Sequence, residues 1–273
     1  MADVRDVLED TWNYIQCDNN DDSASEFFGL NSYSWCADAT FDTSGYDDLV
    51  KLFGPSTIPV FFSEYGCNQE TNVGNPRKFS EVASIYGKEM TALSGGLVYE
   101  YSQEANFFGL VDVFEKNVTL RQDFDNLQSQ YNKLDLNLLQ STNKTATSLK
   151  APKCGESLIK KKGVVSTNFT IPAAPAGAED IIKNGLKGQV TGKLVQVTKT
   201  KVEFDVYGSN RGKIDNLELK ILANNAINTP GQGNTTGNAN SANAEDKKKN
   251  GGNRLTGSLV ALTTVFAVML TML

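Results

Sequence analysis

One carboxylate is a candidate for chemistry because it directly follows a run of apolar residues. Glu64 comes at the end of the mostly apolar segment 58–63 and is followed by Tyr65 and Gly66. An ionised side chain at the mouth of a buried strand is costly unless it has a partner or a chemical task. Two interpretations stay open: a carboxylate paired structurally at the rim of a sheet, or the nucleophile of a retaining glycosidase. The second needs another, protonated carboxyl group about 5 Å away.

Tyrosines near the ends of predicted strands could assist such a carboxylate. Tyr33, Tyr65 and Tyr99 could each stack on a sugar ring or donate a hydrogen bond to Glu64. Each is equally compatible with an aromatic side chain that only packs at the rim of the sheet.

The composition of the chain excludes several kinds of site. There is no histidine, so Ser-His-Asp and Cys-His nucleophile systems are excluded within this chain. The usual ligand of catalytic zinc is also missing, and we predict neither a metal nor a cofactor. The net charge is −6, which argues against nucleic acid as a partner. Chemistry here must rest on carboxylates, Tyr, Lys or Cys.

The elements that would position these residues alternate between strands and helices. Apolar strands are predicted at 26–35, 58–63 and 95–101, and amphipathic helices at 2–16, 44–53, 76–91 and 123–141. This order is typical of parallel βα units, and in a βα barrel the C-terminal strand ends carry the chemistry. Three strands cannot close a barrel. The predicted fold class is therefore α/β, the C-terminal portion of a (β/α)8 TIM barrel whose earlier strands are missing.

Composition divides the chain into four predicted parts. They are the C-terminal part of the barrel domain at 1–154, a small β-rich module at 155–227, a disordered Asn/Gly/Ser-rich stalk at 228–250 and an anchor signal at 251–273, whose hydrophobic tail is 259–273. The tail follows small residues and a short polar spacer, which matches a glycosylphosphatidylinositol (GPI) anchor signal with attachment at Asn250. An ordinary tail anchor is the alternative.

Cysteines and glycosylation motifs favour the secretory route. The cysteines are even in number and widely spaced, which indicates two disulfides in an oxidising compartment; they are Cys17, Cys36, Cys67 and Cys154. The Asn-x-Ser/Thr sites must face solvent to carry glycans; they are Asn117, Asn143, Asn168 and Asn234. Met1 opens no signal peptide, so we expect that the true N-terminal part is missing from this sequence.

Three segments, in order along the chain, resemble one enzyme family. Phe-Phe-Ser-Glu-Tyr-Gly-Cys-Asn at 61–68 resembles the nucleophile motif of fungal β-1,3-glucanosyltransferases, glycoside hydrolase family 72. Phe-Gly-Leu-Asn-Ser-Tyr-Ser-Trp-Cys at 28–36 is similar to the preceding barrel strand of that family, and Gly-Gly-Leu-Val-Tyr-Glu-Tyr at 95–101 to its last strand. The resemblance runs from about residue 2 to Cys154.

The resemblance implies an enzyme of the fungal cell surface, held at the outer leaflet of the plasma membrane by a GPI anchor and present in the cell wall. Such enzymes cleave an internal β-1,3-glucosidic bond and keep one part as a glycosyl ester. They then transfer it to a hydroxyl of a second glucan, a retaining double displacement. Its partners would be β-1,3-glucan donor and acceptor chains.

The resemblance also assigns roles to individual residues. Glu64 matches the nucleophile, and Tyr33 and Tyr99 match active-site tyrosines. Phe108 stands where the family has a further active-site tyrosine, and we include it and Asn31 among the substrate-binding residues. The implied disulfides are Cys36–Cys67 and Cys17–Cys154.

Besides Phe108, the chain departs from the family pattern in two further respects. It contains no Asn-Glu dipeptide, which carries the acid/base in the family, and no cysteine follows Cys154, so the Cys-rich carbohydrate-binding module of some members is missing. We therefore predict that this chain is inactive by itself. The alternatives are a non-catalytic, GPI-anchored wall glycoprotein that binds β-glucan, and a β-1,3-glucan hydrolase of the same fold.

Overall fold

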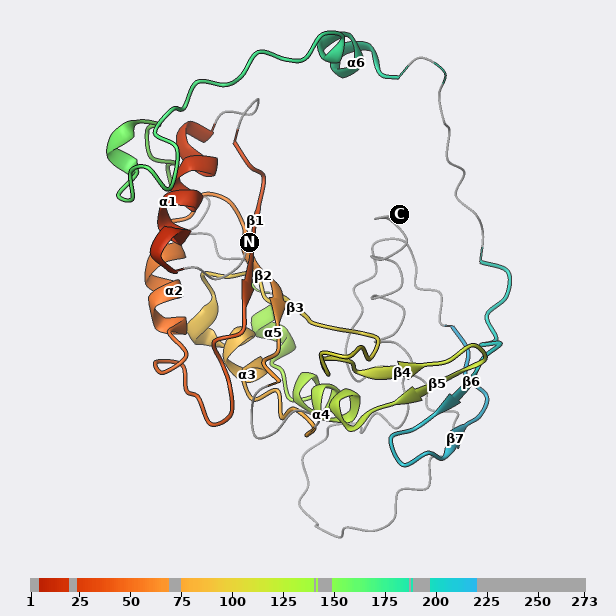
Figure 1. Ribbon diagram of the computed structural model, residues 1–273. Helices are drawn as coiled ribbons and strands as arrows, with labels where there is room; N and C mark the ends of the chain where they lie inside the picture. The colour runs from red at the N-terminus through yellow and green to blue at the C-terminus, as the bar shows by residue number, and fades with distance from the viewer. Residues whose placement is uncertain are drawn as a thin grey trace.

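The computed structural model describes residues 5–19, 24–68, 75–139, 141, 149–186, 188 and 197–219 (Figure 1). The predicted stalk and tail, with Asn250, lie outside these residues, as do the glycosylation motifs at Asn143 and Asn234. Among the described helices, none is long and apolar enough to cross a membrane.

A parallel sheet of three strands is the framework of the N-terminal half. The strands are β1 (Phe28–Ser32), β2 (Val60–Tyr65) and β3 (Gly96–Val98), in the order β1-β2-β3. Both pairings are parallel, so the predicted strands and their direction are confirmed, with shifts of a few residues at their ends. Parallel strands bring their carboxyl ends to one edge of the sheet.

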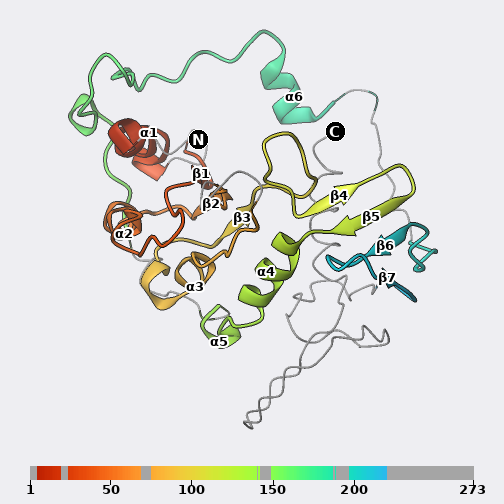
Figure 2. The same cartoon turned by 60° about the horizontal axis from the view of Figure 1, so that its bottom comes forward.

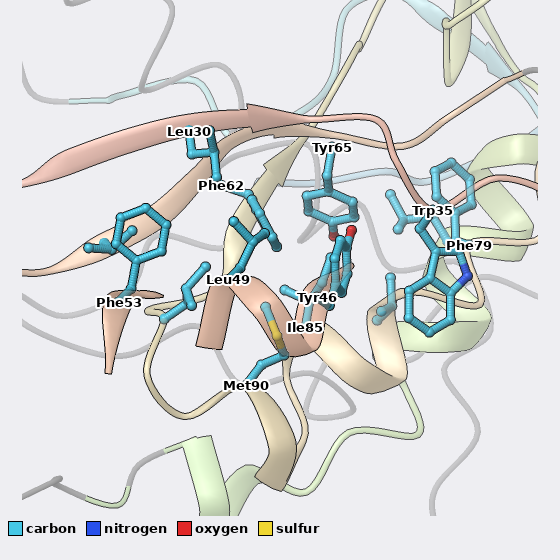
Figure 3. Close-up of a cluster of buried hydrophobic side chains, with 14 of the residues drawn as sticks. Leu30, Trp35, Tyr46, Leu49, Phe53, Phe62, Tyr65, Phe79, Ile85 and Met90 are labelled. Atoms are coloured by element: carbon cyan, nitrogen blue, oxygen red, sulfur yellow. The ribbon is translucent and has the colours of Figure 1, made fainter. Parts of the chain in front are cut away.

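Helices pack on one face of this sheet (Figure 1). They are α1 (Arg5–Gln16), which precedes β1, α2 (Tyr46–Phe53), which connects β1 to β2, and α3 (Val82–Ile85) with the 3-10 helix η2 (Lys88–Met90), which connect β2 to β3. In Figure 3, Leu30 and Phe62 of the sheet lie beside Leu49 and Phe53 of α2, and all four are buried. Burying one such side chain contributes roughly 1.5–3 kcal/mol, so this layer is a major source of stability.

The connection between β2 and β3 is less helical than its apolar pattern predicts. The prediction of one helix at 76–91 is wrong, because only α3 is α-helical there. Phe79 has φ 54°, a left-handed value that an α-helix cannot include. Gly87 is extended, with φ −94° and ψ 177°. The apolar side chains still reach the core: Phe79, Val82, Ile85 and Met90 are buried.

A second sheet joins segments that are far apart in the sequence (Figure 2). Its strands are β4 (Val111–Val113), β5 (Asn117–Leu120), β6 (Asp205–Tyr207) and β7 (Lys213–Ile214), in that order. β4–β5 and β6–β7 are antiparallel, whereas β5–β6 is parallel. This one sheet therefore spans the boundary predicted at residue 154, although the domain limits themselves stay a prediction.

The remaining helical elements are short. They are η1 (Cys17–Asn19), α4 (Gln122–Tyr131), α5 (Leu136–Leu139), η4 (Glu156–Leu158) and α6 (Ala178–Asn184). The single helix predicted at 123–141 is thus two helices, separated by a turn. Of these elements, α4 bears most directly on the site, since its buried residue Asp123 pairs with Arg77 in the connection between β2 and β3.

Two disulfides close the described structure. Cys17 and Cys154 are bonded with a Cα–Cα distance of 5.0 Å, and Cys36 and Cys67 with one of 5.3 Å. Both predicted pairings are confirmed. The first ties the end of α1 to a distant segment, and the second ties together the segments that leave β1 and β2.

Candidate active site

Glu64 lies at the carboxyl end of β2, opposite the end of β1. The register runs from Leu30 opposite Phe62 to Asn31 opposite Glu64, so Ser63 is an extra residue in β2. Such a bulge changes the direction of the side chains that follow it. Ser63 Oγ donates a hydrogen bond of 2.6 Å to Asn31 Oδ1, which fixes the irregularity from the side of β1.

Tyr33 donates a hydrogen bond to Glu64. Its hydroxyl lies 2.6 Å from Glu64 Oε2, a length typical of a bond to an ionised acceptor. Burial raises the pKa of Tyr33 well above its usual range, and the hydrogen bond and charge of Glu64 raise it further. Tyr33 therefore keeps its proton and stays a donor, and it holds Oε2 of a carboxylate in a defined position.

Two further aromatic rings, those of Phe108 and Tyr99, pack against the Tyr33 ring. The Phe108 ring centroid lies 5.5 Å from that of Tyr33 and 5.4 Å from that of Tyr99, and both contacts are edge-to-face. Tyr33 and Tyr99 are 6.4 Å apart, also edge-to-face. A hydrogen bond with Glu100 raises the pKa of Tyr99. Side chains from three separate segments thus meet at the edge where β2 ends.

Most of the residues predicted for the site lie together here. Glu64, Tyr33, Tyr99 and Phe108 are adjacent, and Asn31 is opposite Glu64 in the register. Tyr65 is different: it is fully buried, and its hydroxyl lies 2.7 Å from that of Tyr131. The idea that Tyr65 contacts a sugar or Glu64 is therefore wrong, because strand geometry turns it into the core.

Sequence reasoning missed Arg77, which lies behind the site. Its side chain is 1% exposed and forms an ion pair with Asp123, and it donates to backbone carbonyls of Gly66, Tyr99 and Phe108. Every residue has a backbone carbonyl, so these partners cannot be recognised from the types of side chain. The other partner, Asp123, lies 46 residues away in the sequence. No local motif could have identified it.

Two predicted glycosylation motifs lie within the described residues. Asn168 is exposed, and its backbone carbonyl accepts a hydrogen bond of 2.7 Å from the Tyr14 hydroxyl. Asn117 is half-buried in β5 and lines a cavity of about 570 Å³ together with Phe114 and Tyr207. Glycosylation at both stays a prediction.

Comparison with known proteins identifies the family. The model of glycoside hydrolase family 72, described as glucanosyltransferase, matches residues 1–135. Residues 1–135 belong to glycoside hydrolase family 72. A similar curated protein is 1,3-beta-glucanosyltransferase gel2 of Aspergillus fumigatus, 48% identical over 84% of this chain and 48% of its own length. Another is the probable 1,3-beta-glucanosyltransferase GAS3 of Saccharomyces cerevisiae, 38% identical over 81% of this chain and 43% of its own length.

Solved structures agree with this family 72 assignment. Gas2 of Saccharomyces cerevisiae, in complex with a compound, matches with a TM-score of 0.52 and 32% identity over 66% of this chain and 39% of its own. The same protein in complex with laminaripentaose matches with a TM-score of 0.50 and 30% identity, over 66% and 38%. The chain spans about half the length of the curated relatives it matches.

Proposed function

We propose that the chain contributes the nucleophile side of a retaining β-1,3-glucanosyltransferase site. The observation that carries this proposal is the 2.6 Å hydrogen bond from Tyr33 to Glu64 Oε2, at the carboxyl end of the central parallel strand. It lies within the residues that match family 72. A carboxylate held by a protonated tyrosine is suited to attack an anomeric carbon.

The sheet β1–β3 is, in this proposal, a portion of a (β/α)8 barrel. Its strands are parallel, its helices pack on one face, and its site lies at the carboxyl ends of the strands, as in such barrels. Leu97, on β3, is 53% exposed among the described residues. In a barrel the side chains of the inner face pack against other strands, and an apolar residue such as Leu97 suits that setting.

The chemistry follows from the position of Glu64. Its free carboxylate oxygen attacks the anomeric carbon of a glucose unit, and the bond to the leaving glucan oxygen breaks as that oxygen takes a proton from an acid. The resulting ester is then attacked by a hydroxyl of a second glucan, which gives its proton back to the group that acted as the acid, and Glu64 is released as a carboxylate. Tyr33 holds Oε2 during both steps, and the rings of Tyr99 and Phe108 offer surfaces on which sugars stack.

β-1,3-glucan is the substrate class that we propose. Gas2p, whose structure is similar, is seen in complex with laminaripentaose, and the relatives carry the name 1,3-beta-glucanosyltransferase. Phe108 offers a ring without a hydroxyl, so binding at that position rests on stacking. Asn31 is proposed as a further substrate contact beside Glu64.

The experiment is a transfer assay on the polypeptide at the full length that its gene encodes. It is incubated with reduced laminarioligosaccharides, and the products are separated by size. We expect products longer than the donor, and Glu64→Gln should lower the rate by about 10³-fold or more. Glu104→Gln, an exposed carboxylate in the loop after β3, is the matched control and should change nothing.

Other outcomes contradict the proposal in distinct ways. Products that are only shorter than the donor would indicate a hydrolase. Binding without any product would favour a non-catalytic glucan-binding protein. Full transfer by Glu64→Gln would remove Glu64 from the mechanism. We expect residues 1–250 alone to be inactive, because they contain no Asn-Glu pair to supply the family's acid.

We also propose that the protein is displayed at the cell surface by a GPI anchor on Asn250. The sequence of the tail supports this, and the relatives are fungal glucanosyltransferases. Everything after Asn250 is then absent from the mature protein. Mass spectrometry of the mature C-terminus is the measurement, and recovery of a peptide that contains Phe266 from cell-surface protein would contradict the anchor.

A further inference from the structure

Arg77 is a buried cation with its charge compensated on one side. Its side chain is 1% exposed, and Nε donates a hydrogen bond of 2.8 Å to Asp123 Oδ1. The backbone N–H of Arg77 donates to the same oxygen at 3.2 Å. Asp123 lies in the first turn of α4 and is itself buried. The ion pair therefore fixes the guanidinium to the start of a helix.

The other side of the guanidinium reaches three backbone carbonyls. Nη1 donates to the carbonyl of Tyr99 at 2.8 Å and to that of Gly66 at 3.2 Å, and Nη2 donates to the carbonyl of Phe108. Gly66 lies two residues after Glu64. The three carbonyls thus belong to the segments that carry the proposed nucleophile and the rings of Tyr99 and Phe108.

Two ring contacts complete the surroundings of Arg77. The guanidinium carbon lies 4.6 Å from the ring centroid of Phe79 and 5.7 Å from that of Phe108, within the range of a cation–π contact. Gly66 has φ 113°, and a Cβ atom there would lie 3.2 Å from Nη1. The backbone at Gly66 therefore approaches the guanidinium as closely as glycine allows.

We propose that Arg77 is a positioning residue for the transfer reaction, and that its ion pair with Asp123 sets the relative placement of Glu64, Tyr99 and Phe108. This inference rests on the proposed function of Glu64. Arg77 touches no reacting atom in this account. It acts through the backbone, because it donates to three segments at once. Backbone hydrogen bonds join these segments only in pairs, from Tyr99 N–H to the Tyr65 carbonyl at 2.9 Å and from Glu100 N–H to the Phe108 carbonyl at 3.1 Å, whereas Arg77 ties all three together.

The number and geometry of the partners point to positioning and not only to stability. A buried ion pair is on average no more stabilising than apolar side chains of the same volume, so stability alone is a weak reason to bury Arg77. Only a guanidinium offers five donors in a rigid planar fork. A lysine could keep the charge opposite Asp123, but a single ammonium cannot satisfy three carbonyls that lie in different directions.

The decisive variant is Arg77→Lys in the full-length polypeptide. An activated aryl β-laminarioside serves as donor, because its leaving group departs without a proton. Enzyme is in excess and at a concentration that saturates the donor, so the single-turnover rate constant does not depend on the fraction of inactive molecules. Displacement of a nucleophile by about 1 Å can cost about 10²-fold in rate. We therefore expect the rate constant of Arg77→Lys to fall by roughly a hundredfold.

Two further variants separate positioning from folding. Asp123→Asn keeps the shape of the side chain that pairs with Arg77 and removes its charge. It should lower the single-turnover rate constant by a smaller factor than Arg77→Lys. If Arg77→Lys does not fold, Asp123→Asn takes its place in the test. Arg121→Lys is the matched control, because Arg121 also pairs with a carboxylate, that of Asp112 at 3.1 Å. It makes none of the carbonyl contacts of Arg77 and should leave the rate constant unchanged.

The outcomes are distinguishable. A lower melting temperature with an unchanged single-turnover rate constant in Arg77→Lys or Asp123→Asn would overturn the inference, since the residue would then be structural only. An equal loss in Arg121→Lys would also overturn it. A wild-type protein that forms no glycosyl-enzyme would overturn the proposed function itself, and with it this inference. A loss confined to Arg77 and Asp123 supports it.

Discussion

Two regions at opposite ends of the parallel sheet are each held together by one disulfide and one buried charged side chain. At the amino ends of the strands, Cys17–Cys154 and the buried Asp10 fix a distant segment to α1. Asp10 accepts hydrogen bonds from the backbone N–H groups of Lys160 and Lys161, at 2.9 and 2.6 Å. At the carboxyl ends, Cys36–Cys67 and the buried Arg77 fix the segments around Glu64.

The sign of the buried charge differs because the backbone groups differ. Unpaired N–H groups need an acceptor and unpaired carbonyls need a donor, since a buried polar group without a partner is costly. The anion Asp10 satisfies the first kind, and the cation Arg77 satisfies the second. In barrel folds the amino ends of strands serve stability and the carboxyl ends serve chemistry. We therefore expect mutations at the amino ends to lower mainly the stability, and mutations at the carboxyl ends to lower the transfer rate.

The largest expected effect on stability is at the amino ends. Cys17 and Cys154 are 137 residues apart in the sequence, and in the chain-entropy model a bridge over such a loop contributes about 5 kcal/mol. Cys17→Ser/Cys154→Ser should lower the free energy of unfolding by that amount, measured by urea denaturation. The single-turnover rate constant of folded protein should not change. A large loss of rate would contradict the expectation that the amino ends serve stability alone.

The second disulfide should cost less stability and more activity. Cys36 and Cys67 are 31 residues apart, which corresponds to about 4 kcal/mol in the same model. Cys36→Ser/Cys67→Ser releases the segments that follow Tyr33 and Glu64, so the transfer rate should also fall, by about tenfold or more. Unfolding curves and transfer assays on the same samples test both parts. An unchanged rate would show that the site needs no bridge.

Tyr33→Phe should affect the rate with little effect on stability. It removes the hydroxyl that holds Glu64 Oε2 and keeps the ring that packs on Phe108. A hydrogen bond to a charged group is worth about 1.5–3 kcal/mol, which corresponds to a loss of roughly tenfold to a hundredfold in transfer rate. Equal rates for the variant and the wild type would mean that Tyr33 is only a packing residue.

The smallest expected effect is a loss of stability at high pH. It comes from two buried tyrosines near the carboxyl ends of the strands. Burial raises the pKa of Tyr65 and of Tyr131 well above the usual range. In the unfolded chain both ionise near pH 10, so above that pH the unfolded state binds fewer protons. Stability is therefore complete below about pH 10 and falls as the pH rises further. Tyr65→Phe/Tyr131→Phe should flatten this decline in urea midpoints measured from pH 8 to 11.

Much of the site-bearing sheet could be predicted because its determinants are local. The strands β1, β2 and β3 begin with apolar residues, and polar residues such as Glu64 come at or just after their carboxyl ends. The helix predicted over 76–91 failed because Phe79 takes a left-handed backbone conformation that its apolar spacing cannot reveal. Spacing predicts which side chains are buried better than it predicts the backbone between them.

What could not be predicted depends on long-range pairing. β5 pairs with β6 across a separation of about ninety residues, and no periodicity in either strand specifies the other. Arg77 has backbone carbonyls as partners, which any residue could supply. Tyr33 and Tyr65 looked equivalent as candidates, and only the strand geometry places one beside Glu64 and the other in the core.

The central claim is that Glu64 forms a covalent bond to the transferred glucan. The direct measurement is to mix the full-length polypeptide with a laminarioligosaccharide donor, quench with acid, digest, and locate the glycosyl ester by mass spectrometry. We predict the ester on the peptide that contains Glu64, and none in Glu64→Gln. An ester on another carboxylate, such as Glu100 two residues after β3, or transfer without any ester, would contradict the account.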